Sequence, residues 1–399
     1  MKLLLVATKA PWPPIDGGRF LLLNTLEALA AGGCRVTLVA PVDPAAFDLA
    51  RVTRELSAWC EPVLIPAAPL PPLAALLRSG DGAPLSIARH SLPAVRQEVG
   101  QRLKAERFDL VHAEQLQALP QVERAFTQGV PVVLRAQNVE SDLWRAAGER
   151  GNGVRGLWLR GEARRLAEWE GRAVRRVAAT LALTAEDAAR LGELAGGRVG
   201  VVRAPFPELP PGSGRLEGDP PVVVFGSRGW LPNEDSVAWY LKDVWPAVRS
   251  EVPGAVLHLY GIDLASSPPG VIVHPPPGDS AEAFPPGSIL AVPLRIASGV
   301  RIKILEAWAR GVPVVATPAA LAGLEVEDGK EALVAREARE FATAIRRLRE
   351  DPALAASLIA EGRKARRERH DPREIARCLI AEYEKVIARP VESSGASGS

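Results

Sequence analysis

The fold of this chain is decided by residues 298–317, which read SGVRIKILEAWARGVPVVAT. Apolar side chains recur at helical spacing at Ile302, Leu305 and Ala309, so a helix with that face in the core is expected. Gly311 is suited to end it, because glycine adopts the left-handed conformation without steric cost. The run that follows is apolar and β-branched, as in a parallel strand covered on both faces. The stretch therefore predicts a helix followed by a buried strand, the repeating unit of an α/β fold.

The start of this helix is a candidate binding site for an anion. Ser298 is a suitable N-cap, because its hydroxyl can accept a hydrogen bond from an N–H of the first turn. The backbone N–H groups of Gly299, Val300 and Arg301 would then have no partner inside the helix, and such a terminus binds anions, phosphate above all. Gly299 also lets the backbone approach a ligand closely.

One face of the helix carries an ammonium group followed by a carboxylate. On a helical wheel Gly299, Lys303 and Glu306 share one stripe. Arg301 lies roughly opposite and reaches the same ligand only if the first turn is irregular. A carboxylate beside a phosphate must accept hydrogen bonds from neutral groups such as ribose hydroxyls, so the stretch predicts a nucleotide with its ribose at Glu306. The alternative is a surface helix with a capping serine and a solvated Lys–Glu pair.

Size and composition describe a globular protein of two domains. The chain has 399 residues, of which 47% are hydrophobic and 24% charged. The net charge of +2 is too small to predict nucleic acid as a partner. The three cysteines show no metal-ligand spacing, and prolines interrupt the apolar N-terminus, which favours a reduced, cytoplasmic setting without an export signal. No metal site and no resident cofactor are predicted.

Two groups of residues in the first half lie where strands give way to helices. Gly17 and Gly18 stand between a predicted strand and helix, and a polar group follows a predicted buried strand at Gln137, Asn138 and Glu140. Doubly wound sheets bind ligands at the carboxyl ends of their strands, so both groups are candidate substrate contacts. The alternatives are a tight turn for the glycines and a helix cap for Asn138.

The chain divides where its regular pattern stops. Residues 206–220 are rich in proline and glycine without periodicity, which is typical of a linker. Alternating strand and helix patterns fill residues 1–205 and 221–372, so we predict an α/β fold of two Rossmann-like, doubly wound domains that face each other across a cleft. Residues 373–390 predict a final amphipathic helix, and the Ser/Gly-rich residues 391–399 are expected to be disordered.

An arginine-rich helical region extends from Arg155 to Arg176, with Trp158 and Trp169 among the arginines and three glutamates interleaved. Most such runs are solvated helix faces with opposite charges paired along the helix. The alternative is an electrostatic surface for an anionic lipid headgroup or a lipid-linked acceptor.

Four motifs follow one another in order: Gly17-Gly18, residues 137–140 (QNVE), residues 225–233 (FGSRGWLPN) and residues 301–307 (RIKILEA). In this order they resemble the family-four glycosyltransferases, which have the GT-B architecture. The resemblance covers nearly the whole chain and implies retaining transfer of a sugar from a uridine- or guanosine-diphosphate donor to a saccharide or lipid-linked acceptor, usually without a metal. The third motif resembles a subgroup associated with bacterial exopolysaccharide assembly, which implies a place at the inner face of the membrane.

By resemblance, the motifs assign roles to individual residues. Glu306 matches the carboxylate that binds ribose hydroxyls, and the amides around Gly299 and Val300 match the loop that meets the phosphates. Gly17 and Gly18 match the glycine turn that faces the diphosphate and the acceptor. In GT-B enzymes the last helix usually crosses back to the first domain, and the final helix here is placed to do so.

Three departures from the family's pattern concern the same site. The first carboxylate of the family's pair stands eight positions before Glu306, and here that position is Ser298, which leaves the contact to the donor sugar open. An arginine and a lysine that hold the diphosphate in many members correspond to Ser227 and Asn233. A common histidine corresponds to Gln137, which can hydrogen-bond a sugar hydroxyl but cannot shuttle a proton near neutral pH.

The mechanism that follows needs no nucleophile. Positive charge builds on the sugar while the diphosphate leaves, so catalysis requires groups that stabilise the leaving group in the transition state. We predict Lys303 and Arg301 as these catalytic groups, with Arg228 in reserve and Glu306 at the ribose. One alternative is a non-catalytic protein that binds sugar nucleotides, which Ser298 and Gln137 favour. Another is a sugar-nucleotide epimerase, whose reaction would require more ionisable groups near the sugar.

Overall fold

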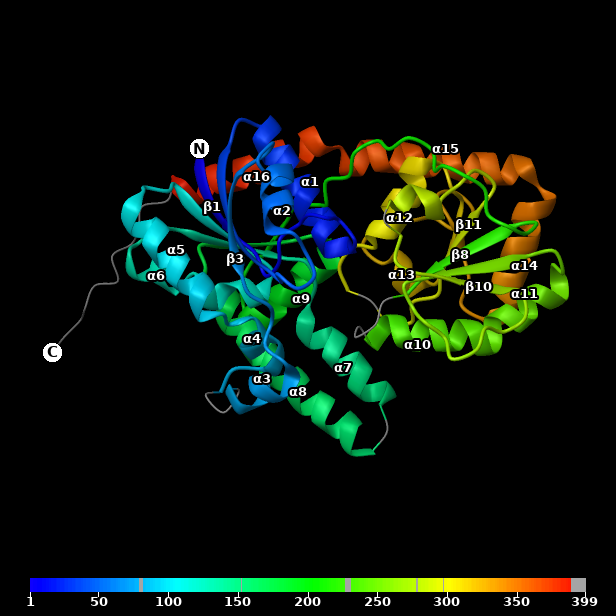
Figure 1. Ribbon diagram of the computed structural model, residues 1–399, viewed down its shortest axis with the longest axis horizontal. Helices are drawn as coiled ribbons and strands as arrows, with labels where there is room; N and C mark the ends of the chain where they lie inside the picture. The colour runs from blue at the N-terminus through cyan, green and yellow to red at the C-terminus, as the bar shows by residue number, and fades with distance from the viewer. Residues whose placement is uncertain (79–81, 152, 227–230, 278, 297, 389–399) are drawn as a thin grey trace.

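The computed structural model describes residues 1–78, 82–151, 153–226, 231–277, 279–296 and 298–388. Within them the chain forms two parallel β-sheets with helices on their faces, and the two halves lie side by side along the longest axis (Figure 1). The predicted α/β fold of two Rossmann-like domains is thus confirmed. The residues expected to form a disordered tail lie outside the described part of the chain.

The first sheet has seven strands in the order β3-β2-β1-β4-β5-β6-β7. Its strand β1 is apolar because both faces are covered, and Leu3, Leu4 and Leu5 are completely buried. Since β1 lies between β2 and β4, the strand order reverses there, which is where such sheets bind ligands. The elements of this half are β1 Lys2–Val6, α1 Gly17–Ala31, β2 Arg35–Val42, α2 Leu49–Leu56, β3 Glu61–Pro66, α3 Pro72–Arg78, α4 Leu85–His90, α5 Pro93–Ala105, β4 Leu110–Glu114, a 3₁₀ helix Leu116–Gln121, α6 Glu123–Thr127, β5 Val132–Ala136, α7 Glu140–Arg150, α8 Gly153–Arg176, β6 Ala179–Ala182, α9 Ala185–Ala195 and β7 Gly200–Val201.

The second sheet has six strands in the order β10-β9-β8-β11-β12-β13. Here β8 lies between β9 and β11, so this sheet has its own reversal point. The elements are β8 Pro221–Phe225, α10 Leu231–Trp239, a π-helical turn Tyr240–Val244, α11 Trp245–Glu251, β9 Val256–Tyr260, β10 Val271–His274, a 3₁₀ helix Ser280–Ala283, β11 Ile289–Val292, α12 Ile302–Arg310, β12 Val314–Ala316, α13 Pro318–Leu321, β13 Leu333–Val334, α14 Ala338–Glu350, α15 Pro352–His370 and α16 Pro372–Ile387.

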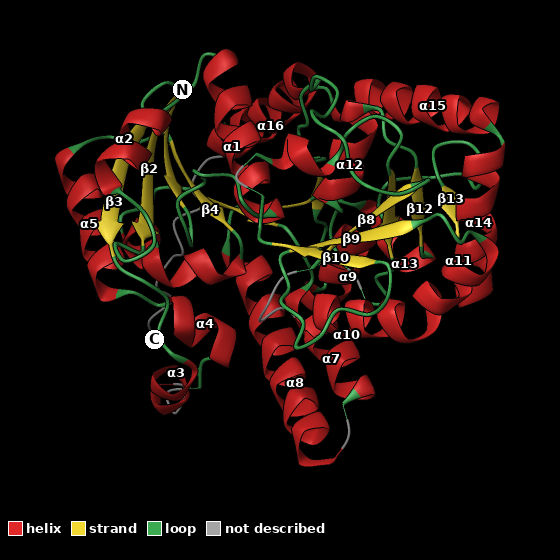
Figure 2. Ribbon diagram, turned by 45° about the vertical axis from the view of Figure 1, so that its right-hand side comes forward, coloured by secondary structure: helices red, strands yellow, loops and turns green. Residues whose placement is uncertain are grey.

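The last two helices join the halves. Helix α15 packs on α12 of the second half, and α16 lies beside α1 of the first half (Figures 1 and 2). Ile375, Leu379 and Tyr383 of α16 are buried in the same apolar cluster as Leu3 and Leu5 of β1. The C-terminal helix is therefore part of the core of the first half.

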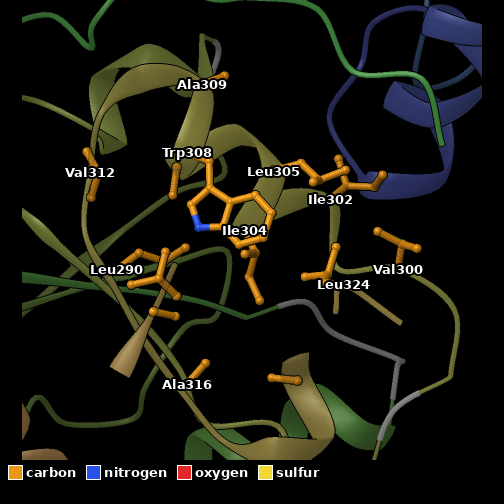
Figure 3. Close-up of a cluster of buried hydrophobic side chains, with 14 of the residues drawn as sticks. Leu290, Val300, Ile302, Ile304, Leu305, Trp308, Ala309, Val312, Ala316 and Leu324 are labelled. Atoms are coloured by element: carbon orange, nitrogen blue, oxygen red, sulfur yellow. The ribbon is translucent and has the colours of Figure 1, made fainter. Parts of the chain in front are cut away.

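Helix α12 anchors the second half and touches the first. Trp308 is buried at its centre and donates its indole N–H to the carbonyl of Glu331 at 3.0 Å (Figure 3). Gly311, with φ +78°, ends the helix in the left-handed conformation, as predicted. At the other end, a side chain on Gly17 of α1 would lie 3.5 Å from Ile302, so the two halves meet at the start of α12.

Candidate active site

The carboxyl edge of the second sheet carries a row of stacked aromatic rings. Phe225 at the end of β8 stacks on Tyr260 at the end of β9 with ring centroids 5.5 Å apart, and Tyr260 stacks on His274 of β10 at 4.4 Å. Lys303 of α12 places its ammonium 4.5 Å from the centre of the Phe225 ring and 5.9 Å from that of Phe284. The lysine predicted to be catalytic thus lies where doubly wound sheets bind ligands, against ring faces that attract cations.

Glu306 lies behind Lys303 and is completely buried. Its carboxylate accepts hydrogen bonds from Lys303 Nζ at 2.9 Å, from Arg310 Nε at 3.2 Å and from the Ser280 hydroxyl. Burial raises the pKa of Glu306, but the Lys303 ammonium and the hydrogen bonds outweigh burial and hold the pKa below its ordinary value. Glu306 is therefore an ionised group that positions Lys303, and a ribose would reach it only after neighbouring side chains move.

Helix α12 begins at Ile302, later than the sequence predicts. Arg301 occupies the N-cap position with φ −82° and ψ 92°, and no side chain caps the helix. Gly299 has φ +71°, so the chain turns before the helix and cannot continue it back to Ser298. The prediction that Ser298 caps the helix is therefore wrong, and so is the prediction that Gly299 shares a helical stripe with the lysine and glutamate.

The polar groups of this loop are held by a carboxylate from the first half of the chain. Asp187, in the first turn of α9, accepts a hydrogen bond from the Ser298 hydroxyl at 2.8 Å and another from the Gly299 N–H at 2.9 Å. The Ser298 oxygen accepts the N–H of Val139 at 2.7 Å. Arg301 donates to the carbonyl of Ser298, and burial lowers the pKa of Arg301 to about 10 although Asp187 opposes this shift. The loop before α12 thus holds an anion, as the sequence predicts, but that anion is the carboxylate of Asp187 and not a ligand.

In the first half, Gln137 follows β5 and is held from two sides. Its amide donates to Glu114 Oε1 at 2.8 Å, and its oxygen accepts from Gln115 Nε2 at 2.7 Å. Glu114 also bonds Nε2 of His112 at 2.8 Å, and Nδ1 of that ring meets the Tyr383 hydroxyl. Burial raises the pKa of Glu114, but the hydrogen bond to His112 and other partners keep it below its ordinary value. A buried polar chain therefore connects α16 to Gln137.

Gly17 and Gly18 form the first turn of α1, which Asp16 caps. A Cβ on Gly18 would lie 3.3 Å from Gln137 Oε1 and 3.4 Å from Lys9 Nζ. Lys9 pairs with Asp16 at 2.7 Å. Burial raises the pKa of Asp16, but Lys9 and the capping hydrogen bond outweigh it and lower the pKa. The glycine turn thus lies directly beside Gln137, and Lys9 adds positive charge to this face.

Asn138 and Glu140 connect α7 to the contact between the halves. With its carboxamide oriented to satisfy both of its groups, Asn138 donates to the carbonyl of Ser298 at 2.8 Å. Burial raises the pKa of Glu140. Glu170 accepts the N–H of Glu140 at 2.7 Å, and burial, with a smaller contribution from the Glu140 charge, raises the pKa of Glu170 to about 7. The half-buried Glu140 and the buried Glu170 therefore form a carboxylate pair at the start of α7.

The remaining predicted residues fall into two groups. Val300 is 8% exposed and packs in an apolar cluster with Leu21 of α1, so its side chain serves the contact between the halves. Ser227 and Arg228 lie outside the described residues, and so does the side chain of Asn233, whose backbone belongs to α10.

Sequence reasoning missed several partners of these residues. Arg310 stands four positions after Glu306, and this helical spacing could have revealed it. Lys9 follows β1 at the carboxyl end of a strand, which is also a usable signal. Asp187 has no such signal, because 111 positions separate it from Ser298 and its own context predicts only a helix start.

Two regions of the chain match known protein families. Residues 17–207 match the glycosyl transferase 4-like domain, and residues 220–351 match the glycosyl transferases of group 1. Together with the two facing α/β halves and the site between them, these matches define a glycosyltransferase of GT-B architecture. The chain belongs to the group 1 glycosyltransferases.

Solved structures share the fold at low sequence identity. Anabaena HepE in complex with UDP and glucose is 17% identical with a TM-score of 0.65, over 96% of this chain and 100% of that one. Sucrose-phosphate synthase from Thermosynechococcus elongatus is 15% identical with a TM-score of 0.69, over 97% and 99%. A glycosyltransferase from Rickettsia africae is 10% identical with a TM-score of 0.61, over 98% and 99%. No curated protein matches the sequence.

Among the residues that the structure describes, no helix is both long and apolar enough to cross a bilayer. In the same part of the chain, no three His, Cys, Asp or Glu side chains gather closely enough to hold a metal ion.

Proposed function

We propose that this chain is a retaining hexosyltransferase that uses a uridine- or guanosine-diphosphate sugar. The observation that carries the proposal is the placement of Lys303: a cation held by the buried Glu306, against aromatic rings at the carboxyl edge of the sheet. A second cation, Arg301, stands two residues earlier. Such a pair suits a leaving group that gains negative charge during the reaction.

In the proposed reaction the bond from the anomeric carbon to the diphosphate breaks, and a bond to the acceptor oxygen forms on the same face. Lys303 and Arg301 stabilise the departing diphosphate more strongly in the transition state than in the ground state. Arg301 stays protonated at neutral pH, because its pKa remains about 10. The acceptor proton passes to a phosphate oxygen, so the reaction requires neither a protein nucleophile nor a resident metal or cofactor.

We place the acceptor among saccharides or lipid-linked saccharides used in exopolysaccharide or glycoconjugate synthesis, on the cytoplasmic side of a membrane. The likeness of residues 226–233 to the exopolysaccharide-associated subgroup supports this setting. A nucleotide-sugar donor is supported by Anabaena HepE, whose structures hold UDP and UDP-glucose.

The test is transfer by purified protein from UDP- and GDP-sugars, with EDTA and with Mg²⁺. The anomeric configuration of the product is read by proton NMR. Lys303→Ala should lower turnover about 100-fold, which is the effect of removing one group that stabilises a developing oxyanion. Lys104→Ala, at an exposed lysine of α5, serves as the control. Unchanged turnover in Lys303→Ala would refute the assignment, and an inverted product would refute retention.

A second candidate is a protein that binds sugar nucleotides without turning them over. It is favoured by Ser298 in place of a carboxylate and by the Asp187 contact that holds the loop. Stabilisation by a nucleotide in a thermal-shift assay without any donor turnover would support this candidate. Measurable transfer would exclude it.

A further inference from the structure

One end of the first half carries most of the exposed large apolar side chains. Six of the nine in the described part of the chain belong to α3 and to the first turns of α8. Both elements lie at the same end of the molecule, below the sheets, in Figures 1 and 2. The six side chains are Leu73, Leu76, Leu77, Val154, Leu157 and Trp158.

The two elements are connected by packing. Trp158 of α8 meets Trp144 of α7 edge to face, with ring centroids 5.9 Å apart. Trp144 in turn packs on the small cluster that contains Ala75 of α3. The outermost side chains nevertheless stay in water: Leu77 is 80% exposed and Val154 is 84% exposed. Apolar side chains gathered in this way on a surface mark an interaction site.

Basic side chains lie among and beyond the apolar side chains at the start of α8. Between Gly153 and Arg165 the helix carries four arginines and one glutamate, and this Glu162 is buried and paired with Arg165. Arg155 and Arg164 are exposed. At 1.5 Å per residue, Arg164 lies about 15 Å further along the axis than Val154. Apolar side chains at the tip, with Arg155 among them and Arg164 further along the helix, match a lipid interface, where long basic side chains extend back to headgroup level.

We propose that this α3–α8 tip, defined by Leu73, Leu77, Val154, Leu157 and Trp158, docks on the surface of a bilayer that contains anionic phospholipids. Charge complementarity selects this partner, because excess arginine beside apolar side chains favours a negative interface over neutral lipid.

Helix α7 relates the tip to the contact between the two halves. It runs from Glu140, two residues after Asn138 at that contact, to Arg150 near the tip, and its 11 residues span about 16 Å. Docking at the tip therefore holds the proposed active site within the reach of a saccharide attached to a membrane lipid. This last step rests on the proposed function, whereas the docking itself does not.

The test is flotation of the full chain with vesicles, in the absence of donor and acceptor. Vesicles of phosphatidylcholine with about 30% phosphatidylglycerol should carry the protein upward, and vesicles of pure phosphatidylcholine should carry much less of it. Val154→Ser with Leu157→Ser should lower the partition coefficient about tenfold, since both side chains are exposed and their loss leaves the core intact. Arg155→Glu with Arg164→Glu should lower it at least as much and should remove most of its dependence on salt.

Matched controls change the same chemistry elsewhere. Val201→Ser replaces an exposed valine of β7, and Arg215→Glu with Arg373→Glu reverses two exposed arginines away from the tip. The proposal is overturned if vesicle binding does not depend on lipid charge, or if the control substitutions lower the partition coefficient as much as the tip substitutions do. The proposal is also overturned if the tip substitutions dissociate a dimer or a protein complex in solution while vesicle binding persists. Sugar transfer to a soluble acceptor is measured separately, so its failure is distinguishable from the failure of docking.

Discussion

Replacement of Asp187 by Asn should tighten nucleotide binding. The Asp187 carboxylate holds the Ser298 hydroxyl at 2.8 Å and the Gly299 N–H at 2.9 Å. These donors belong to the loop expected to meet the phosphates of the donor. A diphosphate that uses them must first displace the carboxylate, so the free energy of this contact opposes binding.

The magnitude follows from the two hydrogen bonds. A hydrogen bond to a charged group contributes about 1.5–3 kcal/mol. Asparagine keeps one carbonyl oxygen, so the variant retains one acceptor and loses one charge-assisted bond. The contact should weaken by about 2 kcal/mol, and because about 1.4 kcal/mol is a factor of ten, the Kd for UDP or GDP should fall about 30-fold. The same loss should lower the thermal midpoint of the protein without nucleotide.

Isothermal titration calorimetry with UDP and GDP measures the change in Kd, and differential scanning fluorimetry measures the midpoint. Asp235→Asn is the matched control, because Asp235 also bridges the halves through Arg150 at 3.2 Å but touches none of the loop donors. It should lower the midpoint without changing the Kd. If Asp187→Asn leaves the Kd unchanged or raises it, the carboxylate does not compete with the nucleotide and the reasoning is refuted.

Three further predictions concern buried groups. Burial raises the pKa of Glu170 to about 7, so the folded state keeps a proton that the unfolded state releases near pH 4.5, and stability should fall as pH rises between these values. Glu170→Gln should remove on the order of 3 kcal/mol of this dependence, read as the free energy of unfolding in urea at pH 5 and pH 8; an unaltered pH profile would contradict the assignment. Gly362→Ala should lower the free energy of unfolding by about 1–3 kcal/mol, because its Cβ would lie 2.5 Å from Cδ1 of Trp308. Gly161→Ala should be neutral or stabilising, because its Cβ would meet no atom within 4 Å beyond its chain neighbours and the backbone of its own helix; equal effects would contradict the packing argument. Glu306→Gln should lower the free energy of unfolding by about 3 kcal/mol, because it leaves the buried Arg310 without its counter-charge; a variant as stable as the parent would show that the carboxylate is not ionised.

The elements of the fold were predictable because their signals are local. The alternation of β-branched runs with helical spacing predicted the strands on both sides of the linker, and the structure places β1 at Lys2–Val6 and β12 at Val314–Ala316. Lys303 and Glu306 were predicted to share a helix face, and they are joined at 2.9 Å. Such pairs follow from the helical repeat alone.

The start of α12 was not predictable in the same way. Ser298 is a good cap by type, but the left-handed turn at Gly299 moves the first helical residue to Ile302. A capping preference is worth about 1 kcal/mol. The contacts with Asp187 and Val139 that hold the loop outweigh such a preference.

By itself the sequence determined the two α/β domains, the alternation of strands and helices along the chain, and the stripe on α12 that joins a lysine to a glutamate, since these depend on periodicities of a few residues. Only the tertiary structure decided what the loop before α12 binds, because its partners Asp187, Val139 and Asn138 come from the other half of the chain. Hydrogen bonds between groups more than 100 positions apart depend on how the two domains pack, and no local pattern encodes them.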